Sequence, residues 1–145
     1  MADLLDRLLA NSGTYVGSQA DPGDTSGRPP TVARINVSPL PGNAGVAFDY
    51  EVLDADGSRP HHEHSILART TTGVVLITSH THADVVTVIS ETEPGYFEAS
   101  DGTSRFPMAI RLAMPEDGHL VYAWSYGSNQ DPMRVRDIGN VHLLR

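Results

Sequence analysis

The sequence predicts an all-β domain, an antiparallel up-and-down β-barrel of about ten strands with a short N-terminal helix. From residue 13 onward, apolar residues alternate with polar ones in short segments, which is the period of a half-buried strand. Turn residues separate these segments at near-regular intervals, and no helical segment is long enough to connect parallel strands. Sequential hairpins give antiparallel pairing, and closing the sheet removes its exposed edges. A two-sheet sandwich such as a jelly roll is the second architecture that the pattern allows.

Length and composition limit the classes of protein. The chain has 145 residues, enough for one domain with its own core, which we place at residues 1–145. Its net charge of -8 argues against a nucleic-acid backbone or an anionic membrane surface as partner. It has no cysteine, which excludes disulfides, thiolate metal sites and a cysteine nucleophile. No apolar run approaches the roughly 18 residues of a membrane span, and the N-terminus lacks the pattern of a signal peptide. We therefore expect a cytoplasmic protein.

One helical pattern stands at the N-terminus, from Ala2 to Ala10. Four leucines fall on one side of this segment, as in an amphipathic helix: Leu4, Leu5, Leu8 and Leu9. The sequence Asn-Ser-Gly at 11–13 ends it. Because so short a helix needs tertiary contacts, we expect it to pack against one end of the sheet.

Predicted strands cover the rest of the chain. The clearest is 46–52, where apolar and polar residues alternate strictly, and a turn at 54–57 leads from it into a histidine-rich strand at 60–69. The other predicted strands are 13–18, 31–38, 74–79, 84–91, 95–100, 106–114, 119–126 and 133–145, the last with a kink or bulge at Gly139. Residues 19–30 are rich in turn formers and predict a long loop, of a kind that often carries function.

Residues that face the barrel interior are the candidate binding residues, because a barrel of this size can enclose one small ligand. The candidates are Phe48, Tyr50, His62, His64, Met108, Ile110, Leu112, Tyr122 and Trp124. Each apolar member is also explained by plain core packing. Tyr122 and Trp124 need hydrogen-bond partners for their polar atoms if they are buried.

The histidine-rich strand has two faces, and only one of them can line the interior. One face carries two imidazoles beside apolar groups: His62, His64, Ile66 and Ala68. The other face carries an imidazole, a carboxylate and their neighbours: His61, Glu63, Ser65, Leu67 and Arg69.

The length of the turn before this strand decides which face is inside. A three-residue loop pairs Tyr50 with His62 and Phe48 with His64. A two- or four-residue loop instead puts His61 and Glu63 on the face of Tyr50. We favour the three-residue loop, because it brings the more apolar face of the strand to Phe48. This register predicts that His62 is a polar group of the cavity and that His61 lies on the surface, and it leaves the position of His64 open.

Two segments carry a family resemblance. Residues 60–69 read Pro-His-His-Glu-His-Ser-Ile-Leu-Ala-Arg and precede Gly-Val-Val-Leu at 73–76, and the chain closes with Val-His-Leu-Leu-Arg at 141–145. The first segment resembles the central Pro-x-His-x-Glu-x-Gly-Phe-Leu-Arg segment of the nitrobindin-like, fatty-acid-binding-protein-like calycins, and the second is similar to their C-terminal strand. His64 and Ile66 stand where that pattern has glutamate and glycine.

The resemblance implies a barrel with an apolar cavity and, as a possible cofactor, haem. A histidine of the C-terminal strand binds the haem iron in that group, so the resemblance assigns this role to His142 and makes His62 a cavity histidine. The residues alone favour an exposed position for His142 near the end of the last strand over a role as haem ligand.

A metal site is the alternative from another class. His62-Glu63-His64 has the His-x-His spacing with which imidazoles on one face chelate a metal ion. Residues 115–119 loosely resemble the second motif of the cupins, but a cupin has a glutamate about four residues after its His-x-His, and residues 66–69 are Ile-Leu-Ala-Arg. His80 and His82 form a second pair of this spacing.

We therefore predict non-catalytic binding of a small, mostly apolar ligand in the barrel, with haem and a lipid-like molecule as the candidates. A metal-dependent, cupin-like enzyme is the alternative function. A third option is a filled barrel that acts through its surface, for example as a homodimer. The chain has no nucleophile elbow, phosphate loop or dinucleotide fingerprint to favour another enzyme class.

Overall fold

In the part of the chain that the structure describes, ten antiparallel strands form one sheet in chain order, each hydrogen-bonded to the next. The computed structural model describes residues 3–19, 31–81, 83–99, 108–115, 118–128 and 131–143, with the backbone alone for 18–19 and from 125 onward. The strands are β1 (Gly13–Gln19), β2 (Thr31–Pro39), β3 (Gly45–Leu53), β4 (His61–Thr70), β5 (Gly73–His80), β6 (Thr87–Glu93), β7 (Tyr96–Ala99), β8 (Met108–Ala113), β9 (Leu120–Ser128) and β10 (Asp131–Leu143). Residues 20–30 of the predicted long loop lie outside the described residues.

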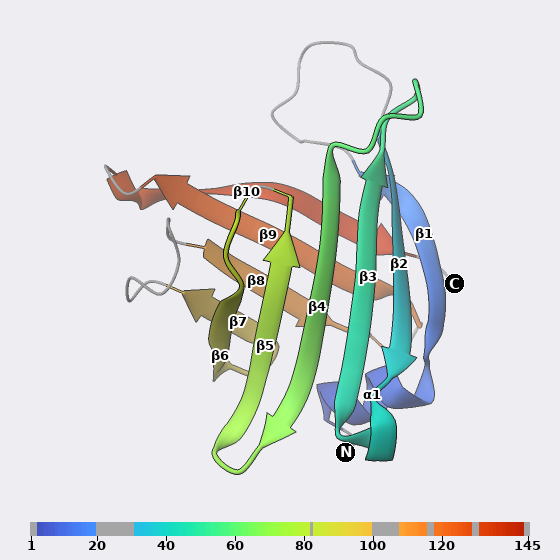
Figure 1. Ribbon diagram of the computed structural model, residues 1–145, viewed down its shortest axis with the longest axis vertical. Coiled ribbons are helices and arrows are strands. Elements are labelled where there is room, and N and C mark those ends of the chain that lie inside the picture. The colour runs from blue at the N-terminus through green and yellow to red at the C-terminus, as the bar shows by residue number, and fades with distance from the viewer. Residues whose placement is uncertain are drawn as a thin grey trace.

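The sheet curls into a nearly closed up-and-down barrel, because β10 returns to lie beside β1. Figure 1 shows β3, β4 and β5 as a front wall, with β8, β9 and β10 crossing behind them at an angle. The predicted fold class, an all-β barrel with a short N-terminal helix, is confirmed. The buried apolar side chains of both walls form one hydrophobic cluster between them.

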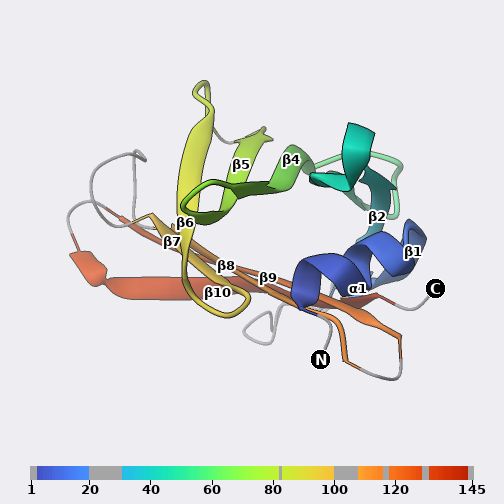
Figure 2. The same ribbon diagram turned by 90° about the horizontal axis from the view of Figure 1, so that it is seen from below.

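The helix α1 (Leu4–Ala10) lies at one end of the barrel, as Figure 2 shows. Its N-cap residue Asp3 accepts a hydrogen bond from a first-turn backbone N–H at 2.8 Å. Leu5 and Leu8 are buried in the core, and Arg7 Nη1 donates to the Met114 carbonyl oxygen at 2.6 Å. These contacts tie the helix to the barrel, as predicted. In the described part of the chain, no helix has the length and apolar character needed to cross a membrane.

Most predicted strand boundaries agree with the structure, with small differences. β6 begins only at Thr87, because residues 84–85 form a bend, and a short 3-10 helix (Pro41–Asn43) lies in the connection between β2 and β3. The pairing of β10 with β9 shifts between Asp137 and Gly139. The irregularity predicted at Gly139 is therefore confirmed.

The register predicted between β3 and β4 is wrong. Tyr50 pairs with Glu63 and Phe48 with Ser65. β3 ends at Leu53 and β4 begins at His61, so the connection covers residues 54–60 and is not the tight loop assumed from the sequence. Because side chains alternate along a strand, a register change of one residue exchanges the two faces of β4.

The inner face of β4 therefore carries His61, Glu63, Ser65 and Leu67, and the outer face carries His62, His64 and Ile66. The neighbours Leu67 and Ile66 show the difference, since Leu67 is 1% exposed and Ile66 is 37% exposed. Tyr122 and Trp124, two buried residues of β9, donate hydrogen bonds to the carboxylate of Glu63. These bonds offset the desolvation cost of burying the charge, which would otherwise keep this face of β4 outside.

Candidate functional site

A buried carboxylate with four hydrogen-bonding neighbours lies inside the barrel. Glu63 is 1% exposed. Its Oε1 accepts hydrogen bonds from the Tyr122 hydroxyl and from Ser65 Oγ. Its Oε2 accepts a hydrogen bond from Trp124 Nε1 at 2.9 Å and lies 3.2 Å from His61 Nε2. Both oxygens of the carboxylate are thus fully used by the protein.

The strand geometry accounts for this arrangement. Tyr122 and Trp124 are alternate residues of β9 and point into the barrel, as do Glu63 and Ser65 of β4 from the opposite wall. Ser65 Oγ also lies 2.9 Å from Thr78 Oγ1 of β5, which extends the network to a third strand. The network therefore joins the two walls through hydrogen bonds between residues far apart in the chain.

Glu63 is ionised in this environment. Burial raises its pKa, because a charged group loses its hydration inside the barrel. Hydrogen bonds from His61, Ser65 and Tyr122 outweigh that effect, and the net result is a pKa below the ordinary value of 4.5. A buried anion held by several donors is stable only while those donors stay in place.

The two phenols near this carboxylate stay neutral. Burial, followed by the negative charge of Glu63, raises the pKa of both Tyr50 and Tyr122 well above the usual tyrosine value. The Tyr122 hydroxyl donates to Glu63. Tyr50 is only 3% exposed, and no hydrogen bond joins its hydroxyl to any residue that the structure describes. A buried phenol usually has a hydrogen-bond partner, so the Tyr50 hydroxyl is an unsatisfied donor beside the network.

Aromatic rings surround the carboxylate and reach the barrel end. The Tyr50 ring centroid lies 5.0 Å from that of His61 and 5.2 Å from that of Tyr122. The Trp124 ring lies 6.0 Å from His61 and 4.9 Å from His80. His61 begins β4, His80 ends β5, and the His61 side chain is 15% exposed. The network therefore extends from the buried Glu63 to His61, whose side chain is partly exposed, while His80 beside it is buried.

The structure brings most of the predicted lining residues together inside the barrel. The buried inner residues are Phe48, Tyr50, Met108, Ile110, Leu112, Tyr122 and Trp124. His62 and His64 lie on the outer face, which corrects the predicted cavity position of both. The backbone of His142 pairs with Val121 on β9, but its side chain lies outside the described residues.

Sequence reasoning missed the polar half of the interior site, namely His61, Glu63, Ser65 and His80. The signal that could have found it was the alternation along 60–69, which groups the first three on one face. The two- or four-residue loop considered above would have turned that face inward.

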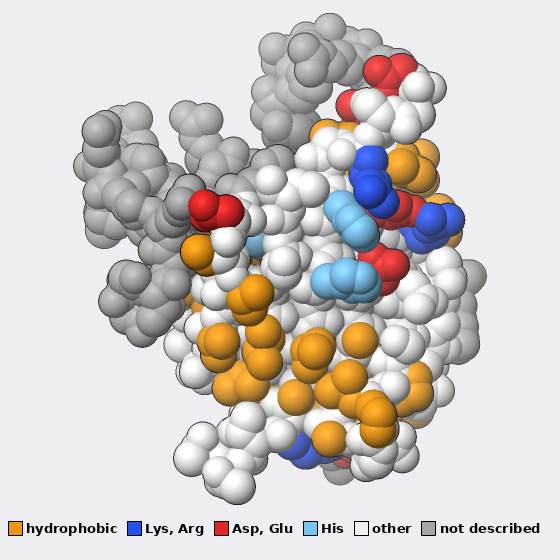
Figure 3. Space-filling model, viewed as in Figure 1, with side chains coloured by type: hydrophobic (Ala, Val, Ile, Leu, Met, Phe, Trp, Pro, Cys, Tyr) orange, Lys and Arg blue, Asp and Glu red, His pale blue; other side chains and the backbone are white. Residues whose placement is uncertain are grey.

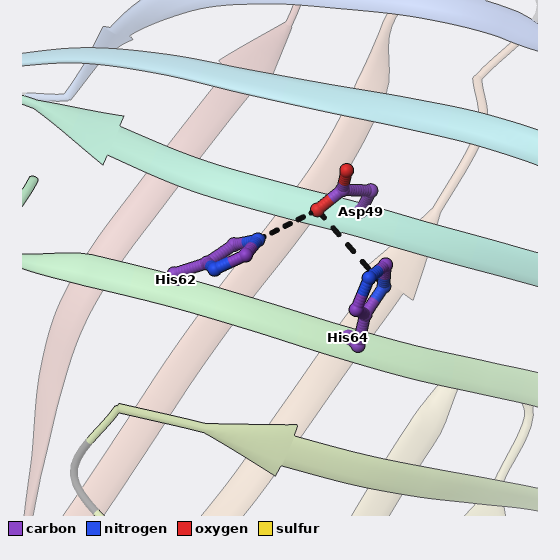
Figure 4. A group of neighbouring side chains, drawn as sticks. All are labelled: Asp49, His62 and His64. Carbon is purple, nitrogen blue, oxygen red and sulfur yellow. Dashed lines mark hydrogen bonds and ion pairs between the residues drawn. The ribbon is translucent and has the colours of Figure 1, made fainter.

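A second cluster lies on the outer face of β3 and β4, as Figure 4 shows. His62 Nε2 lies 2.9 Å from Asp49 Oδ1, and His64 Nδ1 lies 3.9 Å from the same oxygen. The three side chains each offer one donor atom, and these atoms lie within 4.8 Å of one another. Asp49 belongs to β3 and pairs with His64 of β4, while His62 shares the face of His64. Two imidazoles and a carboxylate therefore converge on one point above the sheet.

The two arginines near this cluster form ion pairs with Glu51. Arg34 of β2 and Arg59 both pair with Glu51, the second at a distance of 3.5 Å. Among the described residues, no arginine pairs with Asp49. Figure 3 shows histidine side chains at the surface here, between acidic and basic groups and next to an apolar area.

Comparison with protein-family models and with curated protein sequences gives no match for this chain. Its fold and interior define a class in physical terms: a nearly closed antiparallel barrel with an ionised, hydrogen-bonded carboxylate among aromatic side chains.

Proposed function

We propose that the protein binds, without catalysing a reaction, a small and mostly apolar ligand at the aromatic end of the barrel. The fold supports this proposal, because antiparallel barrels of this size commonly hold one small ligand. The aromatic and aliphatic side chains of both walls supply apolar contacts. The partly exposed side chain of His61 connects this end to solvent.

The Tyr50 hydroxyl is the single observation that carries the proposal. It is buried, it has no hydrogen-bonding partner among the described residues, and its ring contacts those of His61 and Tyr122. Leaving a buried hydroxyl without a partner costs about 1–3 kcal/mol. A ligand group that accepts a hydrogen bond from Tyr50 removes this cost, whereas the saturated carboxylate of Glu63 has no further role in direct contact.

The chemistry of the site favours a ligand with a neutral acceptor, such as a carbonyl or an alcohol oxygen. Tyr50 stays protonated, because its pKa is raised, and therefore offers an O–H donor. The negative charge of Glu63 lies near this donor and opposes a carboxylate on the ligand. The ligand class is thus an apolar molecule with an uncharged polar end.

One of the two histidines that the resemblance implied for a haem pocket lies away from the barrel interior. His62, which the resemblance assigned to the cavity, lies on the outer face, and the side chain of His142 lies outside the described residues. The His-x-His pair at 62 and 64 also points away from the interior, so the metal-enzyme alternative gains no support from the barrel cavity.

Fluorescence titration tests this proposal, since Trp124 is the single tryptophan and lies in the cluster. We expect straight-chain alcohols and ketones to change its emission and to displace the neutral lipophilic probe Nile red. Tyr50→Phe should weaken binding by about threefold to tenfold, the effect of one lost hydrogen bond. The half-buried Tyr96 of β7 supplies the matched control, Tyr96→Phe, which should bind like the wild type.

Two results would refute the proposal. One is the absence of any response of Trp124 or Nile red across the ligand series. The other is equal affinity of wild type and Tyr50→Phe, provided that both proteins melt cooperatively. The first result would leave the barrel interior as a packed core, and the second would remove the Tyr50 hydroxyl from the ligand site.

A further inference from the structure

The outer cluster has the composition of a transition-metal site. Imidazole nitrogen and carboxylate oxygen are common ligands of Zn²⁺, and two histidines with one acidic residue are a recurring ligand set. The cluster supplies this set from Asp49, His62 and His64, whose donor atoms lie within 4.8 Å of one another. It lies on the opposite face of the sheet from Tyr50, so it is independent of the proposed ligand site.

The spacing of the donors is close to what a metal requires. Tetrahedral zinc with bonds of about 2.0–2.1 Å holds its ligand atoms about 3.3 Å from one another. Here the distances from Asp49 Oδ1 are 2.9 Å to His62 Nε2 and 3.9 Å to His64 Nδ1. Side-chain rotations of partly exposed residues can close the remaining difference without moving the strands.

The β-sheet fixes the ligands in the required arrangement. His62 and His64 are two apart on β4 and therefore share a face, with ring centroids 5.6 Å from each other. Asp49 pairs with His64 across β3 and β4, which brings its carboxylate to both imidazoles. Because both strands are paired on either side, the backbone beneath the site is held in place.

No arginine of the described residues neutralises the carboxylate of Asp49. Arg34 and Arg59 both form ion pairs with Glu51. The Asp49 carboxylate therefore interacts with the imidazoles of His62 and His64 and not with an arginine. The chain as a whole carries a net charge of -8, which attracts a divalent ion. An exposed histidine–aspartate ion pair contributes little to the stability of the fold. Such a pair also needs only one imidazole, so it does not account for the second imidazole at the same carboxylate.

We propose that Asp49, His62 and His64 bind one divalent transition-metal ion, Zn²⁺ in the first place, on the outer face of the barrel. Cu²⁺ and Ni²⁺ suit the same imidazole ligands. Three protein donors leave one tetrahedral position for water or for an external group.

Titration calorimetry with ZnCl₂ tests this site on tag-free protein stripped with a chelator. We expect one Zn²⁺ per chain. His62→Ala and His64→Ala should each weaken binding at least about tenfold, since even the loss of an outer-sphere partner has an effect of that order. Asp49→Asn should also weaken binding. The matched controls are His119→Ala and Asp56→Asn, which should bind as the wild type does.

Thermal melting provides a second measurement that does not depend on calorimetry. Zn²⁺ should raise the Tm of the wild type and of both controls, and it should leave the Tm of the His62→Ala/His64→Ala double variant unchanged. The double variant without metal should melt like the metal-free wild type, because both side chains are on the outer face. The proposal is wrong if Zn²⁺ does not bind the wild type, or if the double variant binds it with the same affinity and stoichiometry.

Discussion

Glu63 can be buried only because four neighbours satisfy its two oxygens. Tyr122 and Trp124 come from the opposite wall, and Ser65 and His61 come from its own strand. An ionised carboxylate accepts hydrogen bonds at both oxygens, whereas an amide of the same shape has an NH₂ group that donates. This set of donors therefore fits the carboxylate and not the amide. The residue therefore stabilises one particular packing of the two walls.

Glu63→Gln tests this role at constant side-chain volume. The amide nitrogen would face at least one donor of the network and leave polar groups unsatisfied, so we expect the free energy of unfolding to fall by about 2–3 kcal/mol. Urea unfolding followed by Trp124 emission measures the change. Glu98→Gln, at an exposed position of β7, is the control and should alter the free energy by less than about 0.5 kcal/mol. Similar values for the two variants would contradict the role assigned to Glu63.

The same carboxylate predicts how stability depends on pH. The pKa of Glu63 is lower in the folded protein than the ordinary 4.5, so the folded state binds its proton less readily than the unfolded state does. The resulting stability is complete above the unfolded value and is lost as the pH falls through the folded value. Between about pH 5 and pH 3, the wild type should therefore lose more stability than Glu63→Gln. Parallel curves for the two proteins would show that Glu63 does not titrate differently on folding.

At the scale of elements, the register of β3 and β4 decides what the barrel contains. It places Leu67 inside and its neighbour Ile66 outside. Leu67→Ala should cost about 2–5 kcal/mol of unfolding free energy, as a core truncation does, and Ile66→Ala less than about 1 kcal/mol. Urea denaturation of the two variants compares adjacent residues of one strand. The opposite order of effects would restore the register predicted from the sequence.

The strands could be predicted from the sequence, because the period of two appears in almost every segment and is independent of the pairing. The inner positions of Phe48, Tyr50, Tyr122 and Trp124 follow from alternation within their own strands. The register of β4 could not be predicted, because it depends on the connection 54–60, whose length the turn residues do not determine. Glu63 was missed for a physical reason: ionised residues are almost never buried unless paired, and its main partners are 59 and 61 residues away.

At the scale of the whole molecule, barrel closure separates two sites that are neighbours in sequence. Tyr50 faces the interior and Asp49 the solvent, although they are consecutive residues of β3. The inner site is apolar with one fixed negative charge, and the outer site is polar and open to ions. Any preference of the inner site for a ligand charge therefore comes from two sources, the buried Glu63 and the net charge of -8 over the whole chain.

Salt separates these two sources and gives the last prediction. Decanol should bind more tightly than decanoate at neutral pH, because the carboxylate of decanoate would lie near Glu63. Raising the ionic strength from about 0.01 M to about 1 M shortens the Debye length from about 30 Å to about 3 Å and screens exposed charges, but it screens buried ones much less. The preference for decanol should therefore persist in high salt and shrink in Glu63→Gln. A preference that disappears in salt and survives the substitution would assign it to the surface charge, and the neutral-ligand chemistry proposed for Tyr50 would then lose its electrostatic basis.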